Sequence, residues 1–188
     1  MQILPLSAQP FTPPTDRDML ASERRAFVLT HRTCVFGTNR RNDGPAMSIV
    51  YYVPTDGDEL LVSTMRDRSK AKVVARQRKA SLCVLDERWP VSYLQVYCDA
   101  SVDDNPELVV DVMMAAAGRM SGEPLPEDAR PVVQAMAEAE DRVVLRCTPY
   151  ETFAQPPRHL HRNDQEEAIT HWVSATMPWG ASDEAQPA

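Results

Sequence analysis

Residues 59–85 have the sequence ELLVSTMRDRSKAKVVARQRKASLCVL. The two ends of this stretch, ELLVST (59–64) and ASLCVL (80–85), are short runs rich in apolar and β-branched side chains, which is typical of β-strands. Between them, SKAKVVARQR (69–78) has its apolar residues at helical spacing. The stretch therefore predicts two strands connected by a short basic helix.

The strand pattern continues on both sides of this stretch. The runs 33–39 (TCVFGTN) and 46–53 (AMSIVYYV) precede it, and 91–102 (VSYLQVYCDASV) and 142–148 (RVVLRCT) follow it. Turn clusters separate the first three runs, so these are predicted to form a three-stranded antiparallel meander. Six short strands with few helices predict a mainly β, α+β fold, a closed or nearly closed β-barrel.

Helical spacing predicts three further helices, over 16–31 with Thr15 or Asp16 as its cap, over 105–120, and over about 126–140. The four prolines of the first 14 residues predict an extended arm. We therefore expect an N-terminal arm over 1–15, a barrel domain over 16–155, and a partly disordered C-terminal extension over 156–188.

Composition excludes several classes of protein. The 188 residues are 43% hydrophobic and 25% charged, which is ordinary for one globular domain. No apolar run is long enough to span a bilayer and no signal peptide is evident, so we expect a cytoplasmic protein that does not bind membranes. The six glycines form neither a G-x-G-x-x-G motif nor a P-loop, and the HExxH and GxSxG motifs are absent.

Cysteines, histidines and the last tryptophans predict structural roles. Cys34, Cys83, Cys98 and Cys147 show no CxxC spacing, so they are expected to be free thiols buried in strands. His159, His161 and His171 lack a regular ligand spacing, so no metal site is predicted. Trp172 and Trp179 are expected to anchor the tail onto the barrel or onto a partner chain.

Positive charge is concentrated in one segment of this acidic chain. Residues 66–79 contain seven cationic side chains and one acidic side chain, Asp67, which gives this segment a net charge of +6. Because the whole chain has a net charge of −7, the remaining residues sum to −13. Arg66, Arg68, Lys70 and Lys72 surround the predicted helix start, where the helix dipole is already positive. A bound phosphate would relieve this repulsion, although a solvated charged face would show the same pattern. A pI near 5.1 argues against nucleic acid as the partner.

The order and spacing of these segments resemble the flavin/deazaflavin oxidoreductase superfamily, which is built on the split β-barrel of pyridoxamine 5'-phosphate oxidase. The similarity runs from about Glu23 to Phe153, through NDGPAMSIVYYV, DELLVSTMRDRSKAKVV, KASLCVL, YLQVYCDASV and DRVVLRCTPYETFA. It implies a six-stranded split β-barrel with the FMN-binding fold. The sequence departs from the family pattern at Val73, Val74 and Cys98.

The resemblance also implies where a cofactor would bind. In relatives that bind coenzyme F420, a Ser and an Arg-x-Lys hold the cofactor phosphate, and STMRDRSKAK places Ser63, Arg68 and Lys70 at those positions. The flavin ring of family members lies against two strands. The corresponding positions here are Met47, Ser48, Val50 and Thr64, and Trp89 and Tyr93 match the segment that the partner subunit adds to the pocket.

The implied activity is hydride transfer between a deazaflavin and an unsaturated small molecule in a homodimer. The Arg-x-Lys-Ala-Lys pattern favours F420, with FMN as the alternative, and heme or no redox cofactor also stays open. We assign no general acid or base, although Tyr93 could donate a proton. A non-enzymatic flavin or deazaflavin carrier is the alternative function.

Overall fold

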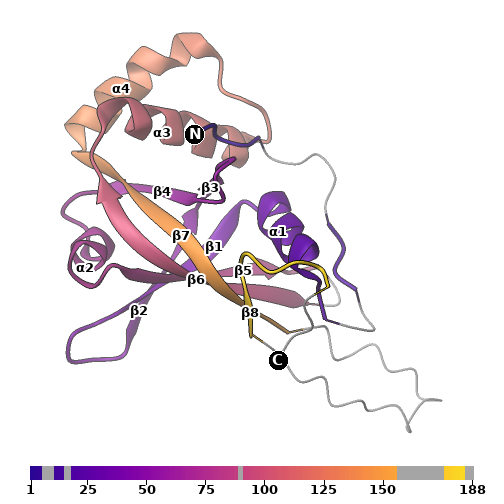
Figure 1. The fold of residues 1–188 in the computed structure, drawn as a ribbon. Coiled ribbons are helices and arrows are strands. Elements are labelled where there is room, and N and C mark those ends of the chain that lie inside the picture. The colour runs from indigo at the N-terminus through magenta and orange to yellow at the C-terminus, as the bar shows by residue number, and fades with distance from the viewer. Residues whose placement is uncertain (6–10, 15–17, 89–90, 156–175, 185–188) are drawn as a thin grey trace, which may run out of the picture.

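The computed structural model describes residues 1–5, 11–14, 18–88, 91–155 and 176–184, and Figure 1 shows the fold. A curved antiparallel sheet of eight strands is covered by helices. Among the described residues, no helix is long and apolar enough to cross a membrane. The elements are α1 (Ala21–Thr30), β1 (Thr33–Asn39), β2 (Pro45–Tyr51), β3 (Val53–Pro54), β4 (Leu60–Met65), α2 (Ser69–Gln77), β5 (Lys79–Asp86), β6 (Ser92–Asp103), α3 (Pro106–Ser121), a short 3-10 helix (Glu127–Ala129), α4 (Arg130–Ala139), β7 (Arg142–Gln155) and β8 (Thr176–Pro178).

The strands follow the order β2-β1-β5-β6-β7-β4-β3, with β8 paired to β7. All six predicted strands are present, and the predicted α+β split barrel of antiparallel strands is confirmed. The predicted meander is only partly present, because β1 pairs with β2, whereas β4 pairs with β7 and with the two-residue strand β3 and not with β2. Leu60, Leu61 and Val62 in β4 are all buried, so this strand needs cover on both of its faces. The position of β4 between β7 and β3, under the helices, covers both faces of the strand.

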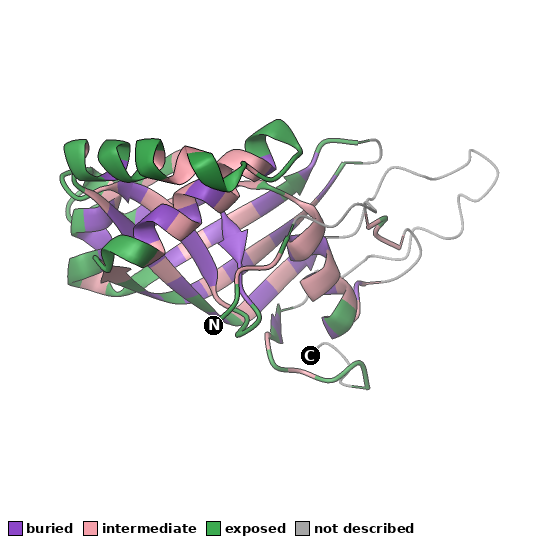
Figure 2. Cartoon of the chain, turned by 90° about the horizontal axis from the view of Figure 1, so that it is seen from above, coloured by how far each residue is buried: buried purple, intermediate pink, exposed green. Residues whose placement is uncertain are grey.

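Two hydrophobic clusters lie on opposite faces of the sheet. The inner cluster fills the barrel and includes Phe36, Leu82 and Leu94. The second cluster lies between the sheet and α3, with Leu61 and Val144 on the strands. In Figure 1, α3 and α4 lie across one side of the sheet, and Figure 2 shows buried residues along the strands with exposed ones on the outer surface of these helices.

The helices begin where local capping allows. Helix α1 starts at Ala21, five residues later than predicted, because the Glu23 carboxylate accepts a hydrogen bond of 2.7 Å from the Leu20 backbone N–H. Thr15 and Asp16, the predicted caps, lie outside the described residues. Helix α3 is capped by Asn105, whose side chain accepts bonds of 3.0 and 3.1 Å from two backbone amides.

All four cysteines are free, as predicted. Cys34, Cys98 and Cys147 are buried in the inner cluster, and burial raises the pKa of each thiol, which keeps them protonated. Cys83 is only half-buried, so its predicted burial is incomplete. It lies on the outer face of β5, which α3 and α4 do not cover.

A buried arginine connects α1 to the C-terminal part of the sheet. Arg24 is only 1% exposed. Its Nη1 donates to the Thr152 Oγ1 at 2.8 Å and to the Thr152 carbonyl at 3.2 Å, and the same hydroxyl donates to the Met177 carbonyl in β8 at 3.2 Å. Trp179 packs against the inner cluster, as predicted for an anchor, whereas Trp172 and the three tail histidines lie outside the described residues.

Thr152→Val should destabilise the protein by about 1–3 kcal/mol, because a buried charged donor and a strand carbonyl each lose a hydrogen-bond partner. Urea unfolding measures this change. Thr148→Val is the matched control, since Thr148 lies on the same strand and is exposed. Equal free energies of unfolding for the two variants would show that the Thr152 hydroxyl does not hold these elements together.

Candidate cofactor site

Helix α2 begins shortly after β4, so its first turn lies at the end of a largely buried strand. Met65 is the last residue of β4, and its carbonyl accepts a bond of 3.2 Å from the backbone N–H of Arg68, the N-cap residue. The first turn of α2 contains no acidic residue. Its free backbone N–H groups are therefore accompanied only by the cations Arg68, Lys70 and Lys72.

Some cations of the segment 66–79 form ion pairs, and others form none among the described residues. Arg66 pairs with Asp104 at 3.4 Å and with Asp141 at 3.1 Å, and Lys79 pairs with Asp99 at 2.7 Å. By contrast, Arg68, Lys70 and Lys72 form no ion pair within the described part of the chain.

Of the three cations, Lys70 has the least well solvated charge. Its side chain is half-buried, and burial lowers its pKa, as does the nearby charge of Arg68. Lys70 is therefore a poorly solvated cation at the helix start, and an anion would stabilise it.

The inner faces of β2 and β4 approach this helix start. Ser48 and Val50 in β2 pair with Phe36 and Cys34, whose side chains are in the inner cluster. Thr64 in β4 is buried and points to the same side as Val62. Strand β2 also lies beside β4. The structure thus places Ser48, Val50 and Thr64 on the barrel side.

Ser63 points away from these residues. Adjacent side chains of a strand alternate between faces, so Ser63 shares the outer face of β4 with Leu61. Its hydroxyl accepts a hydrogen bond of 3.4 Å from Arg142 Nη1. Ser63 and Thr64 therefore contact different sides of the sheet, and only one of them can face a ligand bound on a given side.

Met47 and Tyr93 lie on the outer face of the sheet. The side chains of Met47 and its neighbour Ile49 are 69% and 78% exposed, and the Tyr93 ring lies 6.4 Å from that of Phe153. Trp89 is outside the described residues. The outer face of β1, β5 and β6 forms an open groove of about 630 Å³. Its lining includes Val35, Gly37, Met47, Ser81, Cys83, Gln95, Tyr97 and Tyr150.

Apart from Met47, the groove residues were not predicted from the sequence, although part of the signal was there. The alternation of 91–102 places Tyr93, Gln95 and Tyr97 on one face of β6. Tyr150, from β7, joins them only through strand pairing, and its ring lies 4.2 Å below the Lys79 ammonium. In the described part of the chain, no three His, Cys, Asp or Glu side chains are arranged to hold a metal.

The sequence of the barrel and its helices is similar to that of a known protein family. Residues 20–155 match the sequence model of the family described as pyridoxamine 5'-phosphate oxidase. The chain belongs to this family. The match covers every strand from β1 to β7. The similarity to the pyridoxamine 5'-phosphate oxidase family therefore extends over the whole barrel and both faces just described. No curated protein sequence matches the chain.

Solved structures share the fold of this family member at low sequence identity. A conserved hypothetical protein from Mycobacterium tuberculosis aligns with a TM-score of 0.66 and 22% identity over 78% of this chain and 91% of the other. A heme binding protein from Mycobacterium smegmatis gives a TM-score of 0.60 and 13% identity over 91% and 62%. General Stress Protein 26 from Bacillus anthracis gives 0.52 and 18% over 73% and 94%.

Lys70→Met should leave the ligand-free protein as stable as before or more stable, by about 0.3–1 kcal/mol, because it removes a cation from the positive end of a helix dipole. The gain should be largest at neutral pH. It should shrink as the pH rises through the lowered pKa of Lys70, since the unsubstituted lysine then loses its own charge. Chemical denaturation at neutral and alkaline pH measures both effects.

Lys72→Met is the control for this prediction, since Lys72 is exposed and belongs to the same helix turn. It should show a smaller change with no alkaline loss. A clear destabilisation by Lys70→Met would mean that the charge of Lys70 stabilises the fold in the absence of any ligand.

Proposed function

We propose that this protein binds coenzyme F420 and transfers hydride between that deazaflavin and an unsaturated small molecule. The observation that carries the proposal is the group of cations Arg68, Lys70 and Lys72 at the start of α2, which have no anionic partner among the described residues. The family membership supports the same cofactor class.

The residues at this site fit a phosphate group. Free N–H groups of the first turn of α2 and the two side chains of Arg68 and Lys70 can donate to phosphate oxygens at once. A bound phosphate would also compensate the desolvated charge of Lys70. This combination of backbone donors and uncompensated cations favours a phosphate-bearing cofactor over a neutral ligand.

The strands would position the rest of such a cofactor. Met47 and Val50 offer apolar surface on the two faces of β2, and Ser48 and Thr64 offer hydroxyl groups on the barrel side. When bound, F420 supplies the hydride chemistry itself. The protein would hold the phosphate, orient the ring and exclude water. Tyr93 stays a candidate proton donor if the ring approaches the outer face.

FMN is the alternative cofactor, because it also combines a tricyclic ring with a phosphate. Heme is less well supported by the side chains. Of the four histidines, His31 alone lies in the described residues, and its ring nitrogens face the Phe27 carbonyl at 2.7 Å and the Asp86 carboxylate at 3.7 Å. The buried thiols are held protonated. Neither group provides an available axial ligand.

Arg68→Ala and Lys70→Ala should each weaken F420 binding about tenfold to a hundredfold, the equivalent of about 1.5–3 kcal/mol for charge-assisted hydrogen bonds. Ring fluorescence titration with F420 and FMN, run side by side, measures the affinities. Arg76→Ala is the matched control, because Arg76 is exposed in the last turn of the same helix. Small and equal effects in all three variants would overturn the phosphate site.

The same preparations separate an enzyme from a carrier. The protein, loaded with reduced cofactor, should reduce an added enone or quinone in repeated turnovers, and the Arg68→Ala variant should do so only at higher cofactor concentration. Tight cofactor binding without turnover would favour the carrier. Tighter binding of FMN than of F420 would assign the site to FMN.

We also propose that the outer groove is where two copies of the chain meet. Met47 and Ile49 present exposed apolar side chains on β2, and Leu85 and Tyr150 continue the exposed apolar surface across the sheet. Exposed apolar strands of this kind are stabilised by burial against a partner. A second copy would also close the groove beside Tyr93.

Ile49→Lys should convert a dimer into a monomer, because it places a charge on the exposed apolar surface of β2. Sedimentation velocity at micromolar concentration measures the mass. Val132→Lys on α4 is the matched control, since Val132 is 66% exposed and away from the groove. A monomeric unsubstituted protein, or a dimer that survives Ile49→Lys, would contradict this interface.

A further inference from the structure

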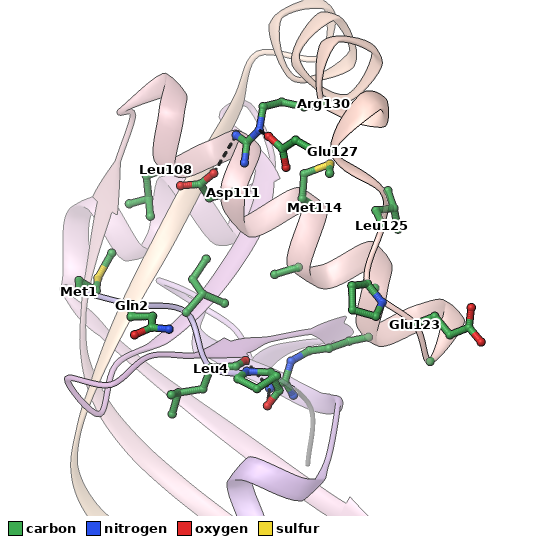
Figure 3. Close-up of a pocket in the computed structure, with 17 residues that line it drawn as sticks. Met1, Gln2, Leu4, Leu108, Asp111, Met114, Glu123, Leu125, Glu127 and Arg130 are labelled. Atoms are coloured by element: carbon green, nitrogen blue, oxygen red, sulfur yellow. Dashed lines mark hydrogen bonds and ion pairs between the residues drawn. The ribbon is translucent and has the colours of Figure 1, made fainter. Parts of the chain in front are cut away.

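A second cavity lies beside α3, apart from the start of α2. It has a volume of about 590 Å³ and is lined by residues 1–5, α3 and the connection 122–130, as Figure 3 shows. This volume falls in the range of small-molecule sites, about 300–1,000 Å³. None of the residues in the cofactor proposal lines it.

The N-terminal residues form one wall of this cavity. The Leu4 backbone N–H donates to the Pro54 carbonyl at 2.9 Å, the Asp56 N–H donates to the Gln2 carbonyl at 2.8 Å, and Ile3 forms a bridge with Thr55. These bonds attach the segment to the turn after β3. This wall of the cavity is therefore held to the rest of the fold by backbone hydrogen bonds.

A close approach of backbone forms the opposite wall. A Cβ atom on Gly118 would lie 3.2 Å from the Glu123 carbonyl oxygen and 3.3 Å from the Pro124 Cα, so glycine lets this turn pack on α3. Gly122, which ends α3, has a φ of +88°, a conformation that glycine adopts without strain. The two glycines thus shape the cavity between helix and turn.

The lining is apolar inside and charged at the edge. Ile3, Leu4, Leu108, Met114 and Leu125 contribute hydrophobic side chains from three separate segments. At the edge, Arg130 pairs with Asp111 at 2.8 Å and also with Glu127, and Figure 3 shows these three side chains together. The charges of Asp111 and Glu127 are therefore already compensated.

Arg119 brings an uncompensated charge to the cavity wall. Arg119 is only 3% exposed, and burial lowers the pKa of its guanidinium. Among the described residues, its donors reach only carbonyl oxygens, of His31 at 3.1 Å, Leu4 at 3.3 Å and Pro5 at 3.4 Å, and its Nε has no partner there. No carboxylate within the described residues pairs with it.

A buried guanidinium in this state is costly, and a carboxylate would relieve it. The two bonds to Leu4 and Pro5 are longer than the usual range of about 2.7–3.2 Å, so they are weak competitors for a charged acceptor. A ligand carboxylate that reached Arg119 would gain shorter, charge-assisted bonds and would use the free Nε donor.

We propose that this cavity binds an amphipathic carboxylate, with the carboxylate directed to Arg119 and an apolar chain along Leu108, Met114 and Leu125. The site is separate from the cofactor site and requires no redox step. It gives the protein a second ligand class that the proposed hydride transfer does not explain.

Decanoate and 1-decanol, which differ in the head group, are the probes. Isothermal titration of the cofactor-free protein, below the concentration at which either probe aggregates, should show saturable binding of decanoate. Decanoate should bind about tenfold or more tightly than 1-decanol, because only decanoate pairs with the guanidinium. Absence of saturable decanoate binding, or equal affinity for both probes, would overturn the proposal.

Ala115→Phe should weaken binding of both probes by filling the cavity, since Ala115 lines it. Ala135→Phe is the matched control on the exposed side of α4 and should bind as the unsubstituted protein does. Unchanged decanoate affinity in Ala115→Phe would place the ligand elsewhere and refute this site.

Arg119→Met should remove the preference for decanoate over 1-decanol and leave 1-decanol binding intact. If this variant does not fold, the ratio of the two affinities in the unsubstituted protein still decides the proposal. Arg68→Ala should leave decanoate affinity unchanged. A loss in Arg68→Ala would mean that decanoate occupies the cofactor site, which would overturn the second site without affecting the first.

Discussion

Strand β4 must be covered on both of its faces, because Leu60, Leu61 and Val62 are buried in succession. The barrel interior covers one face, and α3 covers the other. This constraint explains why β4 does not pair with β2 and lies between β3 and β7. It also fixes where β4 ends, and with it the place where the basic turn and α2 begin. The candidate cofactor site is thus positioned by a packing requirement of a strand that contains no charged residue.

Ion pairing decides which cations of the basic segment are available. Arg66 and Lys79 lie at its two ends and are neutralised by aspartates from other elements. Arg68 and Lys70, at the helix start, have no such partner in the described structure, and the burial of Lys70 makes its charge more demanding. A net charge of −7 would suggest ample compensation, but the acidic residues are not placed where these two cations are. Charge placement, and not total charge, therefore supports an anion site.

The two proposed ligand sites differ in the way a charged ligand would be held. At the start of α2, exposed Arg68 and half-buried Lys70 can be reached from solvent, which suits a cofactor that exchanges. At the other cavity, Arg119 is buried behind an apolar lining, which selects a ligand with an apolar body. The outer groove has no comparable charge apart from Lys79, which Asp99 already pairs, and this suits a surface that meets another protein chain.

Local pattern in the sequence was enough to predict the strands β1, β2 and β4 to β7, the helices α2 and α3, and the cations at the start of α2, because alternation, helical spacing and capping act between near neighbours. The start of α1 was missed, since the Glu23 cap could not be distinguished from an earlier one. Only the tertiary structure decided that β4 pairs with β7, which of Ser63 and Thr64 faces the barrel interior, and that Tyr150 joins the groove. It alone also revealed the cavity beside Arg119. Each of these depends on contacts between segments far apart in the chain, and no local rule of spacing determines which distant segments meet.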